Sequence, residues 1–203
     1  MGMDERPLPR TAHEDLQYIR RTLAAAGHLS IVPGKGMVAI GLLAVAATFV
    51  NFWRTGAPWD GEALNLPGVA VWGVLLAVSL AIGGFAMAQK ARRTGQTFWS
   101  PVLRKALWGY VAAMALGGVL SFSVIEHGRP DALAEIWLGC YGVALMAAGA
   151  VSVSPVRWMG ICFLLAASVA AFAPAAVGLP LLGLGFGWLH LSFGAYIAWR
   201  HEG

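Results

Sequence analysis

Six long apolar stretches, nearly free of charged residues, dominate this chain of 203 residues. An α-helix rises about 1.5 Å per residue, so roughly 20 apolar residues cross the ~30 Å hydrocarbon core of a bilayer. Each stretch has about that length, and together they predict an all-α, polytopic bundle of six transmembrane helices. The predicted spans are residues 36–53, 67–89, 106–125, 136–153, 157–176 and 179–199.

The chain is expected to divide into a cytoplasmic N-terminal segment, residues 1–35, and a transmembrane domain, residues 36–203. Residues 11–27 have apolar side chains at helical spacing, with charged side chains between them. Thr11 and Glu14 fit a capping box at the start of this segment. The pattern predicts an amphipathic interfacial helix that rests on the membrane surface. Docking on a partner protein is the alternative.

The distribution of positive charge predicts the orientation of the spans, because Lys and Arg near span ends resist translocation. Of the fourteen Lys and Arg residues, two fall on one side of the predicted membrane, Arg54 and Arg129, and twelve fall on the other. Both termini are therefore expected in the cytoplasm. The net charge of +4 follows from this asymmetry, so the lipid bilayer is the expected partner and nucleic acid is not. The twelve are Arg6, Arg10, Arg20, Arg21, Lys35, Lys90, Arg92, Arg93, Arg104, Lys105, Arg157 and Arg200.

A faint repeat groups the six spans into three tandem helical hairpins. A proline precedes or opens each odd-numbered span, and a tryptophan occurs in each even-numbered span. Proline suits the first turn of a helix, where no amide donor is needed. The alternative is coincidence in a chain rich in Gly, Ala and Leu, with tryptophans in their ordinary interfacial positions. The pairs are Pro33 with Trp72, Pro101 with Trp137, and Pro155 with Trp188.

His190, midway along the last predicted span, is the conspicuous ionisable residue at membrane depth. Such residues are functional candidates because an unpaired charge there is costly. A neutral imidazole can instead join two helices by hydrogen bonds, or ligate a metal or haem. No second histidine falls within a span, so neither a metal nor a cofactor is expected. Further polar residues in the spans are expected to form hydrogen bonds between helices: Asn51, Ser79, Tyr141, Ser168 and Ser192.

A second candidate cluster lies at the predicted outer ends of spans 3 and 4, where Glu126, His127 and Glu135 flank a short loop. Carboxylates and a histidine in such a position can bind a cation or relay protons into a cavity. The alternative is an ordinary solvated acidic loop.

Two stretches together resemble a group of uncharacterised bacterial six-span integral membrane proteins. One is Asp15-Leu16-Gln17-Tyr18-Ile19-Arg20-Arg21-Thr22 followed by Val32-Pro33-Gly34, and the other is Gly185-Phe186-Gly187-x-x-His190 with Phe193-Gly194. The resemblance implies a location in the bacterial inner membrane and implies no activity or functional residue.

No nucleophile elbow, phosphate loop or HExxH motif occurs in the sequence. A non-enzymatic membrane module, such as an accessory subunit, sensor or signalling partner, is therefore the leading hypothesis. It predicts a tightly packed interior, a locally hydrogen-bonded His190, and an exposed face for a partner protein or a second copy. The alternative is a small-solute or ion transporter or channel, which predicts a continuous polar path from the outer cluster to His190. A membrane enzyme or haem protein ranks third.

Overall fold

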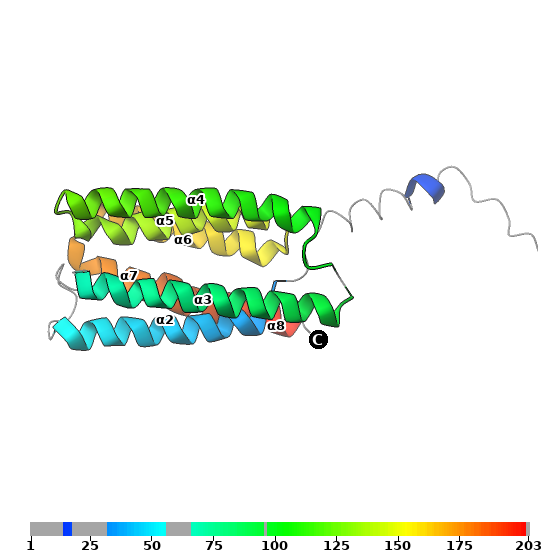
Figure 1. Cartoon of the computed structure of the whole chain (residues 1–203), viewed down its shortest axis with the longest axis horizontal. Coiled ribbons are helices and arrows are strands. Elements are labelled where there is room, and N and C mark those ends of the chain that lie inside the picture. The colour runs from blue at the N-terminus through cyan, green and yellow to red at the C-terminus, as the bar shows by residue number, and fades with distance from the viewer. Residues whose placement is uncertain (1–13, 18–31, 56–65, 96, 202–203) are drawn as a thin grey trace, which may run out of the picture.

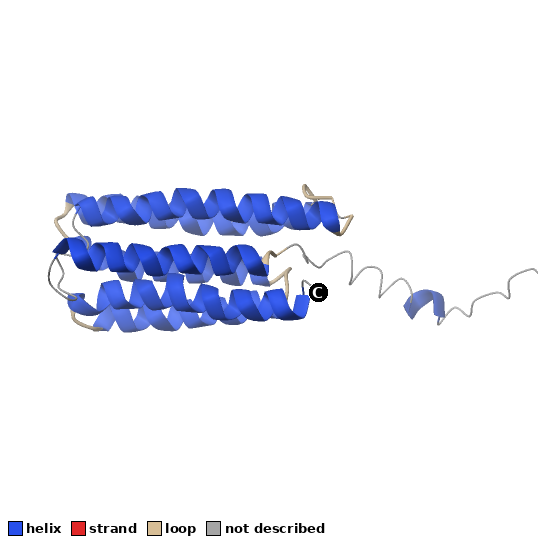
Figure 2. Ribbon diagram, turned by 90° about the horizontal axis from the view of Figure 1, so that it is seen from below, coloured by secondary structure: helices blue, strands red, loops and turns tan. Residues whose placement is uncertain are grey.

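The computed structural model describes residues 14–17, 32–55, 66–95 and 97–201. Within these residues every regular element is a helix, and six helical spans are long and apolar enough to cross a membrane. The predicted all-α six-span architecture is therefore confirmed. The long elements run side by side along the longest axis of the molecule (Figures 1 and 2). They are α2 (Gly34–Thr55), α3 (Leu66–Arg93), α4 (Pro101–Glu126), α5 (Leu133–Gly149) and α6 (Ser154–Phe172).

The sixth span is assembled from three consecutive segments, α7 (Gly178–Leu182), η4 (Gly183–Leu189) and α8 (His190–His201). The middle segment, η4, has the wide turn of a π-helix. Two short 3-10 turns, η2 (Pro130–Ala132) and η3 (Ala175–Val177), precede α5 and α7.

Local sequence explains how α4 begins and ends. The Ser100 side chain accepts a hydrogen bond from the Leu103 amide at 3.1 Å, and Pro101 occupies the first turn, where it loses no hydrogen bond. Gly128, with φ of 67°, lies two residues beyond the helix and reverses the chain in a conformation that favours glycine. The helix starts earlier than residue 106, because helical structure continues through Arg104 and Lys105 beyond the apolar run.

The helices form two units of three. One unit contains α4, α5 and α6, and the other contains α2, α3 and the sixth span (Figure 1). The first two predicted hairpins, α2 with α3 and α4 with α5, pack as expected. The third differs, because α6 packs chiefly against α5 while η4 and α8 pack chiefly against α2.

Glycines explain this difference between the predicted and the observed pairing. A Cβ atom added to Gly41 would lie 2.9 Å from the Gly187 carbonyl oxygen, and one added to Gly194 would lie 3.0 Å from the Gly34 carbonyl oxygen. A Cβ atom added to Gly142 of α5 would lie 3.1 Å from the carbonyl oxygen of Gly160 in α6. Helix backbones approach this closely in membranes where only small residues lie between them. The closest helix pairs are therefore fixed by glycines spaced along each helix.

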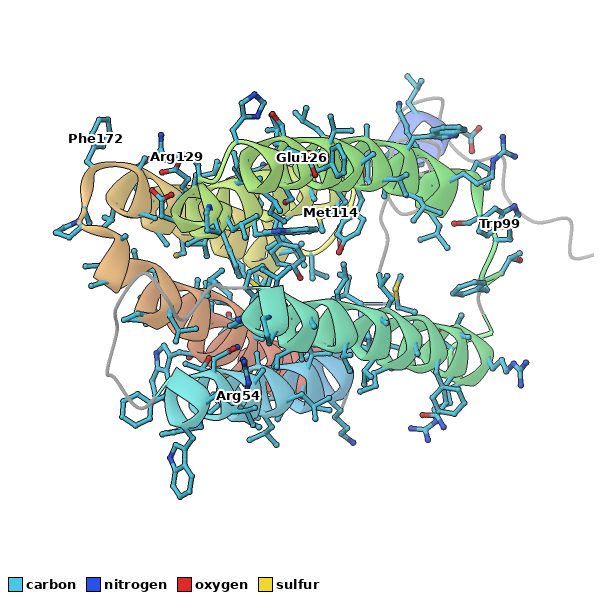
Figure 3. All side chains as sticks on the ribbon, turned by 60° about the vertical axis from the view of Figure 1, so that its left-hand side comes forward. Arg54, Trp99, Met114, Glu126, Arg129 and Phe172 are labelled. Atoms are coloured by element: carbon cyan, nitrogen blue, oxygen red, sulfur yellow. The ribbon has the colours of Figure 1, made fainter. Side chains whose placement is uncertain are left out.

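Up-and-down connection of the spans gathers most of the positive charge at one end of the bundle. Among the described residues, eight of the ten Lys and Arg residues lie at the end that holds the C-terminus, the right-hand end in Figure 1. Arg54, at the last turn of α2, and Arg129 lie at the opposite end (Figure 3). Of the predicted amphipathic helix, residues 14–17 are helical, and the rest of residues 11–27 falls outside the described part of the chain.

Candidate functional site: an apolar cavity between the two helical units

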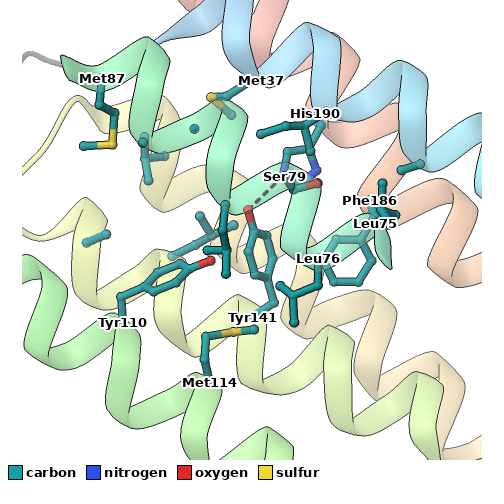
Figure 4. Close-up of a pocket in the computed structure, with 18 of the residues that line it drawn as sticks. Met37, Leu75, Leu76, Ser79, Met87, Tyr110, Met114, Tyr141, Phe186 and His190 are labelled. Atoms are coloured by element: carbon teal, nitrogen blue, oxygen red, sulfur yellow. Dashed lines mark hydrogen bonds between the residues drawn. The ribbon is translucent and has the colours of Figure 1, made fainter. Parts of the chain in front are cut away.

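A cavity of about 500 Å³ lies between the two three-helix units (Figure 4). Residues of α2, α3, α4, α5 and the sixth span line it. Among the described elements, α3 makes its substantial packing contacts with α2 alone, so the face of α3 directed at α4 is left to the cavity. The volume falls within the roughly 300–1,000 Å³ typical of small-molecule sites. The interior is thus not tightly packed throughout, so the tightly packed interior predicted for an accessory subunit, sensor or signalling partner is not found.

The face that α3 turns toward the cavity has a regular sequence pattern. Val69, Trp72, Leu76, Ser79 and Gly83 all line the cavity and recur at intervals of three or four residues. This spacing places side chains on one stripe of a helix, as in helices that pack against a neighbour. Here the described helices leave most of the stripe without a packing partner, apart from Trp72, which packs on Phe186 of the sixth span.

The opposite wall is formed by α4 and α5. Leu103, Tyr110 and Met114 of α4 line the cavity, again at helical spacing, together with Trp137 and Tyr141 of α5. Met114 lies on the side of α4 that faces α3 (Figure 3). The two walls therefore present complementary apolar stripes that are separated by the cavity.

His190 and Tyr141 form the central polar contact of this site. Tyr141 Oη lies 2.8 Å from His190 Nε2, and His190 Nδ1 lies 3.4 Å from the carbonyl oxygen of Gly185. Because a carbonyl oxygen can only accept, Nδ1 carries the proton and Nε2 accepts from the Tyr141 hydroxyl. The predicted local hydrogen bonding of His190 is thus present, and it joins two helices as the sequence suggested. The imidazole is 2% exposed.

The aromatic surroundings of His190 hold the ring in place. Its imidazole is stacked on Phe186, with ring centroids 6.0 Å apart and an interplanar angle of 19°. Phe163 approaches it edge-on at 5.8 Å, and Tyr141 contacts both Phe163 and Phe186. Such a cage is apolar and favours the neutral imidazole.

The π-helical segment η4 positions this cluster. A Cβ atom added to Gly185 would lie 2.7 Å from Leu138 Cδ2 and 2.9 Å from Phe163 Cε1, so glycine is required for these side chains to reach the backbone. The wide turn brings the Gly185 carbonyl oxygen within reach of His190 Nδ1, five residues later. Insertions of this kind into α-helices occur frequently at functional sites.

Four polar side chains from four different spans meet the cavity near the middle of the bundle. Ser79, Tyr110, Tyr141 and His190 all line it, and each lies within four residues of the midpoint of its span. At about 1.5 Å per residue, this corresponds to within roughly 6 Å of mid-membrane depth. The cavity therefore has apolar walls with a narrow polar zone at its centre.

Two polar atoms at the cavity have no hydrogen-bond partner in the described structure, Nε1 of Trp72 and Oγ of Ser79. Both atoms are buried with almost no accessible surface, and both residues line the cavity. Trp72 also packs on Phe186, with ring centroids 6.0 Å apart. Buried polar groups are nearly always satisfied, so these two atoms call for a specific explanation.

No Asp, Glu, Lys or Arg occurs among the described residues that line the cavity. Moving an ion into an apolar, low-dielectric site costs many kcal/mol unless a countercharge is present. The site therefore suits an uncharged molecule and disfavours an ion.

The outer cluster predicted from the sequence forms a separate, smaller pocket of about 250 Å³. His127 and Glu135 line this pocket, while Glu126 is exposed at the end of α4 and does not. His127 Nδ1 lies 2.7 Å from the Ser123 carbonyl oxygen. The two pockets share no lining residue.

Arg129, which also lines this outer pocket, forms an exposed ion pair with Asp131. Arg129 Nε donates to Asp131 Oδ1 at 3.2 Å. This hydrogen bond raises the pKa of the Arg129 guanidinium above its usual value. An exposed pair of this kind contributes little to stability.

The remaining predicted polar residues lie away from the cavity. Ser192 and Ser168 donate to carbonyl oxygens of their own helices, at 2.8 and 2.9 Å, and both are exposed on the surface of the bundle. Asn51 is buried in α2 and donates to the Ala47 carbonyl oxygen at 3.3 Å. The expectation that Ser168 and Ser192 bond between helices is therefore wrong, because a serine hydroxyl reaches the carbonyl four residues earlier more easily.

The structure thus brings two of the six predicted site residues, His190 and Tyr141, together at the cavity, and two others, His127 and Glu135, together at the outer pocket. It adds Trp72, Ser79 and Tyr110, which sequence reasoning did not place in a site. The apolar stripe from Val69 to Gly83 could have identified the face of α3 that lines the cavity. The spacing of its residues does not reveal that α4 is separated from this face.

The chain matches no protein-family model, no curated protein and no solved structure at a significant level. Among the described residues, no group of three or more His, Cys, Asp or Glu side chains is arranged to hold a metal ion. The architecture is that of a multi-pass membrane protein.

Proposed function

We propose that this protein is a non-enzymatic membrane module that binds an uncharged, largely apolar ligand from the bilayer in the cavity between its two helical units. The observation that carries the proposal is the 500 Å³ cavity, with its apolar walls and the His190–Tyr141 pair at its centre. A sensor or accessory subunit that responds to a membrane-soluble molecule fits these features best.

Size and position support a lipid-like ligand. A water molecule occupies ~30 Å³ in the liquid. If each non-hydrogen atom of a ligand takes up the same volume, a cavity of 500 Å³ holds about 17 such atoms. The cavity lies at membrane depth between α3 and α4, two helices that do not pack against each other substantially. A ligand dissolved in the hydrocarbon core can therefore enter sideways, between these helices.

The alternative of an ion or polar-solute transporter has less support. That hypothesis requires a polar path from the outer cluster to His190, whereas the pocket with His127 and Glu135 is separate from the central cavity. The absence of charged groups among the described lining residues also disfavours an ion.

A pair of matched glycine substitutions tests the proposal. Gly83→Phe places a benzyl group in the cavity, because Gly83 lines it and a Cβ atom there has only Ile40 Cδ1 within 4 Å, at 4.0 Å. Gly118→Phe is the control, because Gly118 is exposed on α4, lies outside the cavity lining and has nothing within 4 Å.

Saturable binding of tritiated heptadecane, which has 17 carbon atoms, is measured on purified protein in detergent micelles. We expect one binding site per chain in the wild type and in Gly118→Phe, and a loss of at least tenfold in affinity in Gly83→Phe. Absence of saturable binding in the wild type, or equal binding by both variants, would refute the proposed function.

Orientation and location are part of the same proposal. The concentration of Lys and Arg at the end of the bundle that holds the C-terminus supports cytoplasmic termini. The resemblance of the two terminal motifs supports the bacterial inner membrane. A second copy or another membrane protein is the proposed partner of the exposed helix faces, in keeping with a sensor or accessory subunit.

A further inference from the structure

We infer that the ligand of this cavity is a single unbranched hydrocarbon chain, as in a long-chain alcohol, which lies parallel to the helices with its polar end beside Phe98 and Trp99. This inference rests on the proposed function, since it specifies the shape and the orientation of the molecule bound at the same site. It starts from the length, the width and the two ends of the cavity.

The cavity extends along most of the bundle. On α3 its lining residues run from Val69 to Met87, which are 18 residues and therefore about 27 Å apart. On α5 they run from Leu133 to Ala148, about 22 Å apart. Figure 4 shows Met87 and Leu75 on opposite sides of the hydrogen-bonded pair at the centre. The long dimension of the cavity is thus parallel to the helices and close to the ~30 Å of the hydrocarbon core.

The cavity is narrow for its length. A volume of 500 Å³ spread over about 27 Å gives a mean cross-section of roughly 19 Å², which corresponds to a width near 4 Å. Carbon atoms in van der Waals contact lie about 3.5–4.0 Å apart, so this width admits one carbon chain. A fused ring system places several carbon atoms side by side and is wider. The proportions therefore favour one unbranched chain over a ring system or two parallel chains.

The two ends of the cavity differ in exposure. Toward the end of the bundle that holds Arg54, the lining residues Leu133 and Leu182 are 3% and 4% exposed. At the other end, Phe98 and Trp99 line the cavity and are 37% and 60% exposed. These two aromatic residues lie in the connection from α3 to α4, where Figure 3 labels Trp99. Among the described residues, the cavity is therefore closed at one end and has a mouth, formed by Phe98 and Trp99, at the other.

Helix α4 places the entrance on the same side. Its lining residues lie in the first half of the helix, from Leu103 to Met114. Leu107, within this half, is 38% exposed, and Leu80 across the cavity on α3 is 56% exposed. The gap between α3 and α4 is thus open to lipid from mid-depth to the mouth, and a chain that enters there extends toward the closed end.

The polar end of the ligand is expected at the mouth because hydrogen-bonding partners are available there. Arg104 and Lys105, next to the lining residue Leu103, are exposed, as expected at a membrane surface. A hydroxyl group at the closed end would instead lie near Val69 and Leu133, where it would lose its hydrogen bonds to water. Only the apolar end of the chain suits that environment.

Gonane, a system of four fused rings, tests the shape of the ligand, because it has 17 carbon atoms like heptadecane. Its affinity for the purified protein is measured by competition against tritiated heptadecane. We expect gonane to bind at least tenfold more weakly than unlabelled heptadecane, because side chains would have to move apart to admit the wider molecule. Equal or tighter binding of gonane would overturn the inference.

The variant Gly73→Leu tests the length of the chain. Gly73 lines the cavity, and a Cβ atom there has nothing within 4 Å. Leucine adds four carbon atoms, which at ~30 Å³ each lowers the capacity from about 17 to about 13 non-hydrogen atoms, the size of 1-dodecanol. The wild type should bind 1-hexadecanol about tenfold more tightly than 1-dodecanol, and the variant should prefer 1-dodecanol. The control Gly118→Leu, on the exposed surface of α4, should keep the wild-type preference, and so would Gly73→Leu if the inference were wrong.

Two photoreactive forms of 1-hexadecanol test the orientation. One carries a diazirine at carbon 2, next to the hydroxyl group, and the other carries it at carbon 15. After irradiation of the full-length protein, mass spectrometry identifies the labelled residues. The carbon 2 probe should label Phe98 and Trp99, and the carbon 15 probe should label residues near Val69 and Leu133. A reversed pattern, or the same pattern from both probes, would contradict the proposed orientation.

Failure of this inference can be told apart from failure of the proposed function. If heptadecane and gonane bind saturably with equal affinity, the ligand need not be a linear chain, although the cavity still binds an apolar molecule. If none of the compounds binds saturably to the wild type, the proposed function itself fails.

Discussion

Removal of one hydroxyl group, in Tyr141→Phe, tests the hydrogen bond that joins α5 to the sixth span. The substitution eliminates the 2.8 Å contact between Tyr141 Oη and His190 Nε2. It retains the aromatic ring, whose centroid lies 4.8 Å from that of Phe163 and 5.0 Å from that of Phe186. The substitution therefore leaves the contribution of packing to the free energy of unfolding nearly unchanged. The measured change in that free energy reports the hydrogen bond.

The magnitude follows from the burial of His190. Its side chain is 2% exposed, so loss of the Tyr141 hydroxyl leaves Nε2 as a buried acceptor without that donor. An unsatisfied buried group costs about 1–3 kcal/mol. Hydrogen bonds between helices in membranes contribute about 0.6 kcal/mol on average and up to about 1.7. Because Tyr141 Oη is the hydrogen-bond partner of Nε2 in the described structure, we expect a loss near the upper value, about 1.5 kcal/mol.

Reversible unfolding in mixed micelles with increasing dodecyl sulfate measures this loss. Tyr196→Phe is the matched control, because Tyr196 lies on the surface at 45% exposure, and it should change the free energy of unfolding by less than about 0.5 kcal/mol. A double-mutant cycle with His190→Phe should give a coupling energy of about 1 kcal/mol. Equal stabilities of Tyr141→Phe and Tyr196→Phe, with zero coupling, would refute the assignment of the His190–Tyr141 bond.

Two further predictions concern helix packing and orientation. Gly41→Leu should destabilise the protein by about 3 kcal/mol or more in the same unfolding assay, because its Cβ would lie 2.9 Å from backbone atoms of the sixth span. The control Gly118→Leu should be nearly neutral. Equal effects of the two substitutions would contradict the close approach of α2 to the sixth span. With both native cysteines replaced by alanine, a membrane-impermeant maleimide added outside intact cells should label Ala175→Cys and spare Thr97→Cys, and the reverse pattern would contradict cytoplasmic termini.

The positions and the apolar character of the spans could be predicted from the sequence for a simple physical reason. Insertion into a bilayer depends on the length and apolarity of each segment taken alone, so the run that became α3 is recognisable without knowledge of its neighbours. Helix starts at Pro101 and Ser154 follow from local proline chemistry.

The pairing of helices could not be predicted in the same way. The tandem proline and tryptophan pattern assigned α6 to the sixth span, whereas close glycine contacts pair it with α5. Many small residues in the sequence are compatible with such contacts, and only the fold selects which glycines face each other, such as Gly142 and Gly160.

The candidate site shows the same division. His190 was identified from the cost of placing an ionisable group at membrane depth, which is a property of one residue in one span. Its partner Tyr141 and the unpartnered Trp72 and Ser79 belong to other spans. Whether these residues contact one another depends on distances between spans, which the sequence of one span does not determine.

The sequence by itself determined six membrane spans, the charge asymmetry that favours cytoplasmic termini, and one histidine at mid-depth, because each of these depends on local composition. The tertiary structure alone decided that the helices form two units and that a 500 Å³ cavity lies between them. The cavity exists because α3 packs chiefly against α2 and leaves most of its stripe from Val69 to Gly83 uncovered, which is a relation between helices rather than a property of any one of them.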